Sequence, residues 1–172
     1  NQGAGSASLH DTIQRLNKVL KTDEDAEDIY ETCISKSFVL STDMAHAVHP
    51  NYSDKHEKNH RPKMHHGPVI KSNANQRYAT TATTSFVIEE LCRQDKIPFQ
   101  KFVVRQDMGC GSTIGNIIAS NCGIRTVDLG NPQLSMHSIR EQCATTDLVY
   151  SIRLGEAFFE NFTLLDKKIQ FN

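Results

Sequence analysis

Hydrophobic and polar positions along the chain follow two periods, one typical of strands and one typical of helices. Short apolar runs rich in strand-forming residues predict four strands, at 37–43, 67–73, 99–107 and 124–130. Apolar residues three or four positions apart predict helices at 8–20, 80–94, 110–123 and from 138 towards the C-terminus. The acidic segment 22–32 predicts a loop and a solvent-exposed helix. Strands that alternate with helices predict an α/β fold, with a sheet covered on both faces.

Two pairs of residues have the spacing of a helix start. Ser8 and Asp11 form one S-x-x-D pair, and Ser138 and Glu141 form an S-x-x-E pair. Gly123 ends the helix predicted at 110–123, where glycine suits the end of a helix. We therefore expect the last helix to begin at about residue 138.

A polar, histidine-rich stretch interrupts the alternation at about residues 49–67. Proline and glycine break it, so it predicts a long loop, and such loops in compact domains usually bind something. His49 suits either a residue that orients a metal ligand or a structural residue. Four further histidines suit a metal store or a pH sensor, or else a structural role in a loop that contacts neighbouring subunits: His56, His60, His65 and His66.

Composition and charge narrow the function classes. The 172 residues suit a single domain with a sizeable core. The chain has 19 basic and 20 acidic residues, so its net charge does not favour nucleic acid or an anionic membrane as a partner. No apolar run approaches the roughly 20 residues that cross a bilayer, and the first residues do not resemble a signal peptide. The chain does not begin with Met, as expected of a segment of a larger protein.

The five cysteines are widely spaced and include no C-x-x-C pair, which argues against a structural zinc ribbon. We expect free, largely buried thiols in a reducing compartment, which agrees with a cytoplasmic location. Cys110 precedes a predicted helix, where the pKa of a thiol can fall. Because no paired histidine motif lies near it in the sequence, we expect a structural thiol there.

Two residues of metal-ligand type follow predicted strands. Asp43 ends the strand 37–43, and His137 follows the strand 124–130 after a short loop. Open α/β sheets bind their ligands at the carboxyl ends of strands, so these two side chains can converge on one point. Carboxylate and imidazole together suit zinc. The alternative is that Asp43 caps a turn and His137 lies at the N-terminus of a helix, and spacing alone leaves both open.

Four longer motifs carry a family resemblance. They are "STDMAHAVHPNY", "GPVIKSNANQRYATTA", "CGSTIG" and "DLGNPQLSMHSIRE". Together, and in this order, they resemble the M18 family of metallo-aminopeptidases, with the closest likeness to its eukaryotic aspartyl aminopeptidases. The likeness extends from about Lys36 to Phe162. It implies an α/β zinc-peptidase (phosphorylase/hydrolase-like) catalytic domain, a mixed sheet flanked by helices, of which residues 1–172 would be the C-terminal part.

The resemblance also implies a site with two Zn²⁺ ions and a role for each matching residue. Asp43 and His137 would be zinc ligands, and Asp43 would also contact substrate. His46 would bind substrate, and Lys71 would meet the acidic side chain of the substrate's first residue. Tyr78 would be both substrate-binding and catalytic, because a phenol can donate a hydrogen bond to the developing oxyanion.

The implied activity is release of N-terminal aspartate or glutamate from peptides by a metal-activated water. In the family a Glu-Glu pair, upstream of the part matched by this chain, supplies the general base and a further ligand, so we expect this part alone to be inactive. The alternative is a non-catalytic module that serves folding and self-association. The resemblance further implies a large homo-oligomer, commonly a dodecamer, in the cytoplasm, with delivery to a vacuole or lysosome left open.

Overall fold

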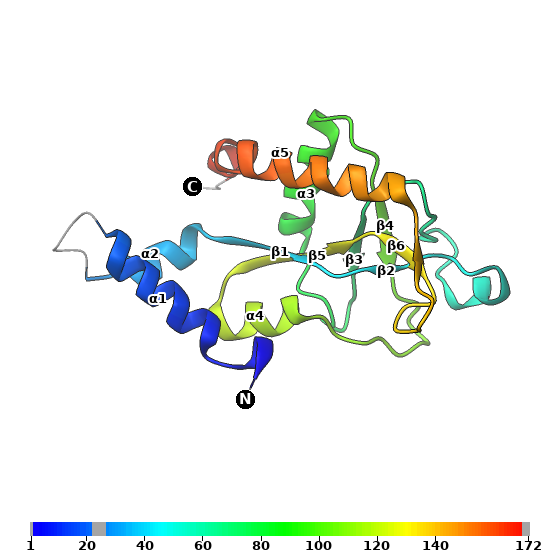
Figure 1. The fold of residues 1–172 in the computed structure, drawn as a ribbon, viewed down its shortest axis with the longest axis horizontal. Coiled ribbons are helices and arrows are strands. Elements are labelled where there is room, and N and C mark those ends of the chain that lie inside the picture. Colours follow the sequence, from blue (N-terminus) through cyan, green and yellow to red (C-terminus); the bar gives the residue numbers. More distant parts are fainter. Residues whose placement is uncertain (1, 22–26, 170–172) are drawn as a thin grey trace.

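The computed structural model describes residues 2–21 and 27–169 (Figure 1). Its helices are α1 (Ser8–Leu20), α2 (Ile29–Lys36), α3 (Ala82–Gln94), α4 (Ile114–Cys122) and α5 (Thr145–Ile169), with 3₁₀ turns η1 (Gly3–Gly5) and η2 (Pro50–Lys55). Its strands are β1 (Phe38–Thr42), β2 (Ala45–His46), β3 (Val69–Ser72), β4 (Gln100–Val103), β5 (Arg125–Gly130), β6 (Pro132–Leu134) and β7 (Gln142–Cys143). Strands and helices alternate as predicted.

The strands form two sheets that meet end to end. The larger has the order β1-β5-β3-β4, with β5 and β3 antiparallel and the other two pairs parallel. The smaller has the order β2-β6-β7. β1 continues into β2 after two residues, and β5 continues into β6 after one, so this parallel pair passes from one sheet to the other. The predicted mixed sheet is confirmed.

Helices cover both faces of the larger sheet, as predicted. In Figure 1, α3 and α5 lie together on one side of the strands, and α4 and α1 lie on the other. The core lies between the sheet and the α3–α5 layer. Its buried members are Ile70, Val87, Ile88, Leu91, Cys92, Ile97, Val127, Leu129, Leu154, Phe158 and Leu165. Each large apolar side chain in it contributes about 1.5–3 kcal/mol through burial.

Local sequence explains why α3 begins where it does. The Thr81 side chain accepts a hydrogen bond from the Thr84 amide, and the Thr84 side chain accepts one from the Thr81 amide. This reciprocal pair satisfies two amides that a helix start leaves without partners. Helix α4 ends as predicted at Gly123, whose φ of 69° places it in the left-handed region.

The prediction that the last helix begins at residue 138 is wrong, since α5 begins at Thr145. The Ser138–Glu141 pair instead lies in the turn between β6 and β7. There the Glu141 carboxylate accepts a hydrogen bond from the His137 amide, and the Ser138 hydroxyl accepts one from the Arg140 amide. Ser and Glu at this spacing satisfy free amides in a tight turn as readily as at a helix start.

Several other expectations can be compared with the fold. Residues 22–26 of the acidic segment lie outside the described residues, and α2 begins after them, at Ile29.

All five cysteines are free as predicted, but Cys92 alone is buried and Cys143 is exposed, so the prediction of largely buried thiols is wrong. Within residues 2–21 and 27–169, no helix is both long and apolar enough to span a bilayer.

Candidate active site

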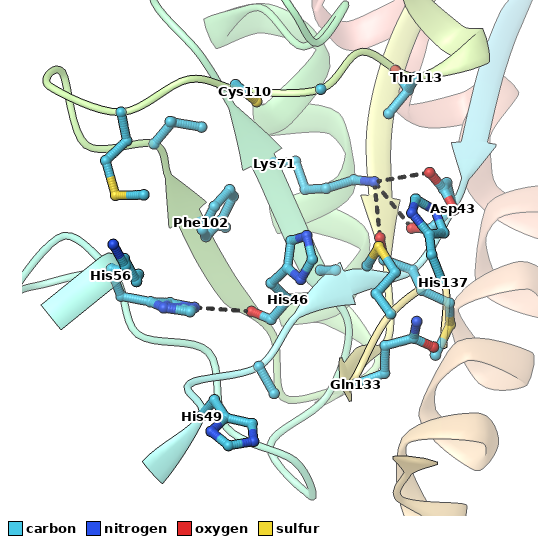
Figure 2. A pocket seen from close by; sticks show the side chains of 18 of the residues that line it. Asp43, His46, His49, His56, Lys71, Phe102, Cys110, Thr113, Gln133 and His137 are labelled. Atoms are coloured by element: carbon cyan, nitrogen blue, oxygen red, sulfur yellow. Dashed lines mark hydrogen bonds and ion pairs between the residues drawn. The ribbon is translucent and has the colours of Figure 1, made fainter. Parts of the chain in front are cut away.

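One pocket of about 540 Å³ opens where the two sheets meet. All five site residues expected from the sequence line it: Asp43, His46, Lys71, Tyr78 and His137. They come from the β1–β2 connection, β2, β3, the β3–α3 loop and the β6–β7 turn. Figure 2 shows Lys71, His46 and His137 approaching the Asp43 region from these separate segments. The fold therefore brings together residues that are up to 94 positions apart in the sequence.

Asp43 is fixed by its backbone rather than by its exposed carboxylate. It directly follows β1, as predicted, and its carbonyl accepts a hydrogen bond of 3.1 Å from Lys71 Nζ. On the other side it touches Gly130 at the end of β5, where an added Cβ would lie 1.6 Å from the Asp43 carbonyl oxygen. Only glycine permits this approach, so β5 and Lys71 together set the place of Asp43.

Lys71 is buried, with 2% of its surface exposed. It is the third of the four residues of β3. Its ammonium donates to the carbonyls of Asp43 and Met44 at 3.1 and 3.3 Å, lies 3.9 Å from Asp43 Oδ2, and sits 5.3 Å from the centre of the Tyr78 ring. Burial lowers the pKa of Lys71, while the nearby carboxylates of Asp43 and Asp128 oppose that change.

His46 and His137 lie close enough to influence each other. His46 ends β2, and its side chain reaches solvent through the pocket. The pocket walls nevertheless lower the pKa of His46 by desolvation, and the charges of His137 and Lys71 lower it further, against an opposing effect of Asp43. A neutral imidazole is thereby favoured, which is the form that binds a metal or accepts a proton.

Tyr78 is half-buried, and its hydroxyl keeps its proton. Burial raises the pKa of Tyr78, and the hydrogen-bonded neighbour Cys110 raises it further. The phenol can therefore donate a hydrogen bond into the pocket at neutral pH. Sequence reasoning treated Cys110 as a structural thiol, yet it lines the pocket beside Tyr78. Its position before α4 was the one signal that pointed to it.

The sequence model of the aminopeptidase I zinc metalloprotease family (M18) matches residues 1–159. The chain belongs to the M18 peptidase family. A probable aspartyl aminopeptidase of Ricinus communis is 56% identical over 168 residues, which cover 98% of this chain and 34% of that protein. The aspartyl aminopeptidase of Dictyostelium discoideum is 50% identical over 169 residues, which cover 96% of this chain and 35% of that protein.

Solved M18 structures share the fold. A chain in the complex of Ape4 and Nbr1 has a TM-score of 0.92 and 44% identity, over 99% of this chain and 32% of that one. The S. cerevisiae mApe1 dodecamer gives a TM-score of 0.84 and 29% identity, over 99% and 37%. The family and fold inferred from the motifs are confirmed. This M18 chain spans about a third of the length of the relatives it matches.

The family is one of zinc metalloproteases, so the donors in the pocket can be tested against zinc. Asp43 and His137 supply a carboxylate and an imidazole, both common zinc ligands. Within the described part of the chain, no three His, Cys, Asp or Glu side chains are grouped so that they could hold a metal ion. The donors present among the described residues therefore fit part of a zinc site.

The loop histidines make separate contacts, which favours a structural role over a metal store. His56 is buried, and its Nε2 donates to the carbonyl of His46 at 3.2 Å, so it braces one wall of the pocket. Each of the others has a hydrogen-bond partner of its own: His49 with Asn51, His60 with Glu57, His65 with Thr146 and His66 with Met64.

Proposed function

We propose that this chain is the C-terminal part of the catalytic domain of an M18 aminopeptidase that releases N-terminal aspartate or glutamate from peptides. The observation that carries the proposal is the convergence of Asp43, His46, Lys71, Tyr78 and His137 on one pocket. Each residue type suits one step of peptide hydrolysis. In the proposed enzyme, residues outside this chain complete the pocket and supply the general base.

Asp43 and His137 would hold zinc together with ligands from outside the chain. Two bound zinc ions would supply a polarised carbonyl and an activated water. The chain's own residues would then orient the peptide. His46, with its lowered pKa, would contact the substrate as a neutral ring. Tyr78, with its raised pKa, would donate its proton in a hydrogen bond to the carbonyl oxygen as negative charge develops there.

Lys71 would provide the preference for acidic residues. Two of its N–H groups donate to backbone carbonyls, and among the described residues no further acceptor lies within hydrogen-bond distance, since Asp43 Oδ2 is 3.9 Å away. A buried ammonium with one free donor is a suitable point-charge partner for a carboxylate. The substrate's aspartate or glutamate side chain would take that third position.

The same proposal includes the cellular setting. We propose a large homo-oligomer because a solved M18 neighbour is a dodecamer. Five free cysteines suit a reducing compartment, so we propose the cytoplasm, with later delivery to a vacuole or lysosome untested.

Zinc content and peptidase activity test the proposal in the longer enzyme. Asp43→Ala and His137→Ala should each lower bound zinc and abolish hydrolysis of aspartyl and glutamyl anilides while circular dichroism stays unchanged. His66→Ala serves as the control, because His66 is an exposed histidine outside the pocket. Full zinc occupancy and activity in both site variants would overturn the proposal and favour a module that serves only folding and self-association.

A further inference from the structure

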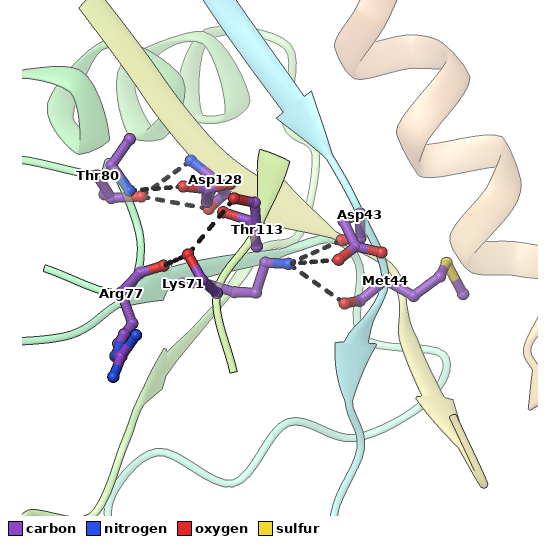
Figure 3. A network of polar contacts seen from close by, with 9 residues as sticks. Asp43, Met44, Lys71, Arg77, Thr80, Thr113 and Asp128 are labelled. Carbon is purple, nitrogen blue, oxygen red and sulfur yellow. Dashed lines mark hydrogen bonds and ion pairs between the residues drawn. The ribbon is translucent and has the colours of Figure 1, made fainter. Parts of the chain in front are cut away.

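Asp128 is a fully buried carboxylate that sequence reasoning did not single out. It lies on β5 with none of its surface exposed, and its register partner on β1 is Ser41. It does not line the pocket, yet its charge influences both Lys71 and Tyr78, which do. Figure 3 shows Asp128 on the far side of Lys71 from Asp43, next to the segment that contains Thr80.

Three contacts tie the segment after Tyr78 to Asp128. Its Oδ2 accepts a hydrogen bond of 2.6 Å from the Ala79 amide. Its own amide donates to Thr80 Oγ1 at 2.9 Å, and that hydroxyl faces the Asp128 carbonyl at 3.4 Å. Residues 73–81 contain no helix or strand, so no regular backbone ladder fixes this stretch. The contacts with Asp128 therefore hold the chain directly after Tyr78, and Ser112 Oγ, which donates to the Arg77 carbonyl at 3.2 Å, holds it directly before.

The second carboxylate oxygen is kept without a protein partner. Asp128 Oδ1, Ser41 Oγ and Thr113 Oγ1 are all buried and make no hydrogen bond among the described residues. Gly115 leaves room for this group, since an added Cβ would lie 2.5 Å from Asp128 Oδ1 and 2.6 Å from Ser41 Oγ. A buried polar oxygen without a hydrogen-bond partner is costly, so this oxygen of Asp128 does not stabilise the fold.

We infer that Asp128 is a positioning residue for Tyr78: it holds the Ala79 amide and thereby fixes the direction of the Tyr78 hydroxyl. The inference rests on the role proposed for Tyr78. The hydroxyl must meet a carbonyl oxygen only as negative charge develops on it, and a misplacement of about 1 Å costs on the order of a hundredfold in rate. The Asp128 carboxylate lies on a central strand of the sheet, so the bond to the Ala79 amide can hold the Tyr78 hydroxyl in a defined position.

Kinetics of two substitutions test the inference in the longer enzyme. Asp128→Ala should lower kcat about tenfold or more, a change of about 1.4 kcal/mol in the barrier, with KM within about twofold. Asp128→Asn should recover much of this loss, because its side-chain carbonyl oxygen can still accept the hydrogen bond from the Ala79 amide. Asp166→Ala is the control: Asp166 is also a buried aspartate, but it pairs with Arg125 away from the pocket.

Hydrogen exchange gives a readout that does not depend on activity. The Ala79 amide should be protected in the wild type and should lose protection in Asp128→Ala. Thr80→Val removes the two contacts of the Thr80 hydroxyl with the Asp128 backbone but keeps the bond between the Ala79 amide and the carboxylate. It should therefore give a smaller fall in kcat than Asp128→Ala, and it tests the inference if Asp128→Ala does not fold. An unprotected Ala79 amide in the wild type, or wild-type kcat in both Asp128→Ala and Thr80→Val, would overturn the inference. Full activity of Tyr78→Phe would instead overturn the catalytic role proposed for Tyr78. Hydrogen exchange of the Ala79 amide would still show whether Asp128 holds that amide.

Discussion

Gly130→Ala should disrupt the site from a position that carries no functional group. A Cβ on Gly130 would lie 1.6 Å from the carbonyl oxygen of Asp43, 2.5 Å from its carbonyl carbon and 3.0 Å from Met44 Cα. All three are backbone atoms, so no side chain can rotate away. Gly130 also pairs with Val69 of β3, which prevents β5 from moving without loss of sheet hydrogen bonds.

The expected magnitude follows from this geometry. Overpacking in a well-packed region costs about 1–3 kcal/mol, and we expect the upper end because the backbone must shift. Asp43 would have to move by about 1 Å or more, which would also cost about a hundredfold in rate. Gly130→Ala should therefore lower the free energy of unfolding by about 2–3 kcal/mol, reduce bound zinc and lower kcat/KM about a hundredfold.

Chemical denaturation, zinc analysis and anilide hydrolysis measure these three effects on the intact protein. Gly155→Ala is the matched control, because Gly155 lies within α5 and has no atom within 4 Å of the added Cβ. That change should be neutral or stabilising by up to about 1 kcal/mol. If Gly130→Ala keeps wild-type stability, zinc and kcat/KM, then the close approach of β5 to Asp43 does not exist as described.

Three further predictions concern the isolated chain, specificity and pH. The 172 residues alone should show no aminopeptidase activity above that of a matched His137→Ala preparation; a rate near the intact enzyme's would contradict this. In the longer enzyme, Lys71→Leu should lower kcat/KM for aspartyl and glutamyl substrates by about ten- to a hundredfold more than for leucyl substrates, whereas an equal fall for both would reject the specificity role. Burial raises the pKa of Cys92 from 9.0 to about 12, so the folded state favours the thiol. Between the unfolded pKa and the folded pKa of about 12, the free energy of unfolding should fall by about 1.4 kcal/mol per pH unit. Chemical denaturation at constant salt measures this fall, and Cys92→Val should remove that contribution.

The sequence predicted the elements of the larger sheet well because each strand and helix has a clear period of its own. It could not show that β3 runs antiparallel to β5, since a buried apolar run has the same appearance in either direction. β2, β6 and β7 span two or three residues each, too few for a period to be visible. The start of α5 was misplaced because Ser138 and Glu141 satisfy amides of a turn with the same spacing that a helix start uses.

Residues that act through their own side chains could be predicted from the sequence, whereas residues that act on the backbone of another segment could not. Asp43 and His137 could be predicted as site residues because carboxylate and imidazole are common metal ligands and because both lie in motifs that resemble the family. Gly130 and Asp128 went unnoticed because each acts on the backbone of another segment: Gly130 by lacking a side chain beside Asp43, and Asp128 by holding the amide after Tyr78. Such contacts join β5 to loops about 50 or more positions away, so no local pattern contains them.

Lys71 shows the consequence for specificity. The family resemblance implied a contact with the substrate's acidic side chain, whereas two of the ammonium's donors already hold the backbone of Asp43 and Met44. Removal of the ammonium would therefore loosen Asp43 as well as any contact with a substrate carboxylate. Lys71→Arg separates the two effects, because guanidinium keeps the charge and the donors but its planar shape suits the two carbonyls poorly. A variant that keeps the preference for acidic residues but binds less zinc would show that the lysine serves Asp43 and the substrate together.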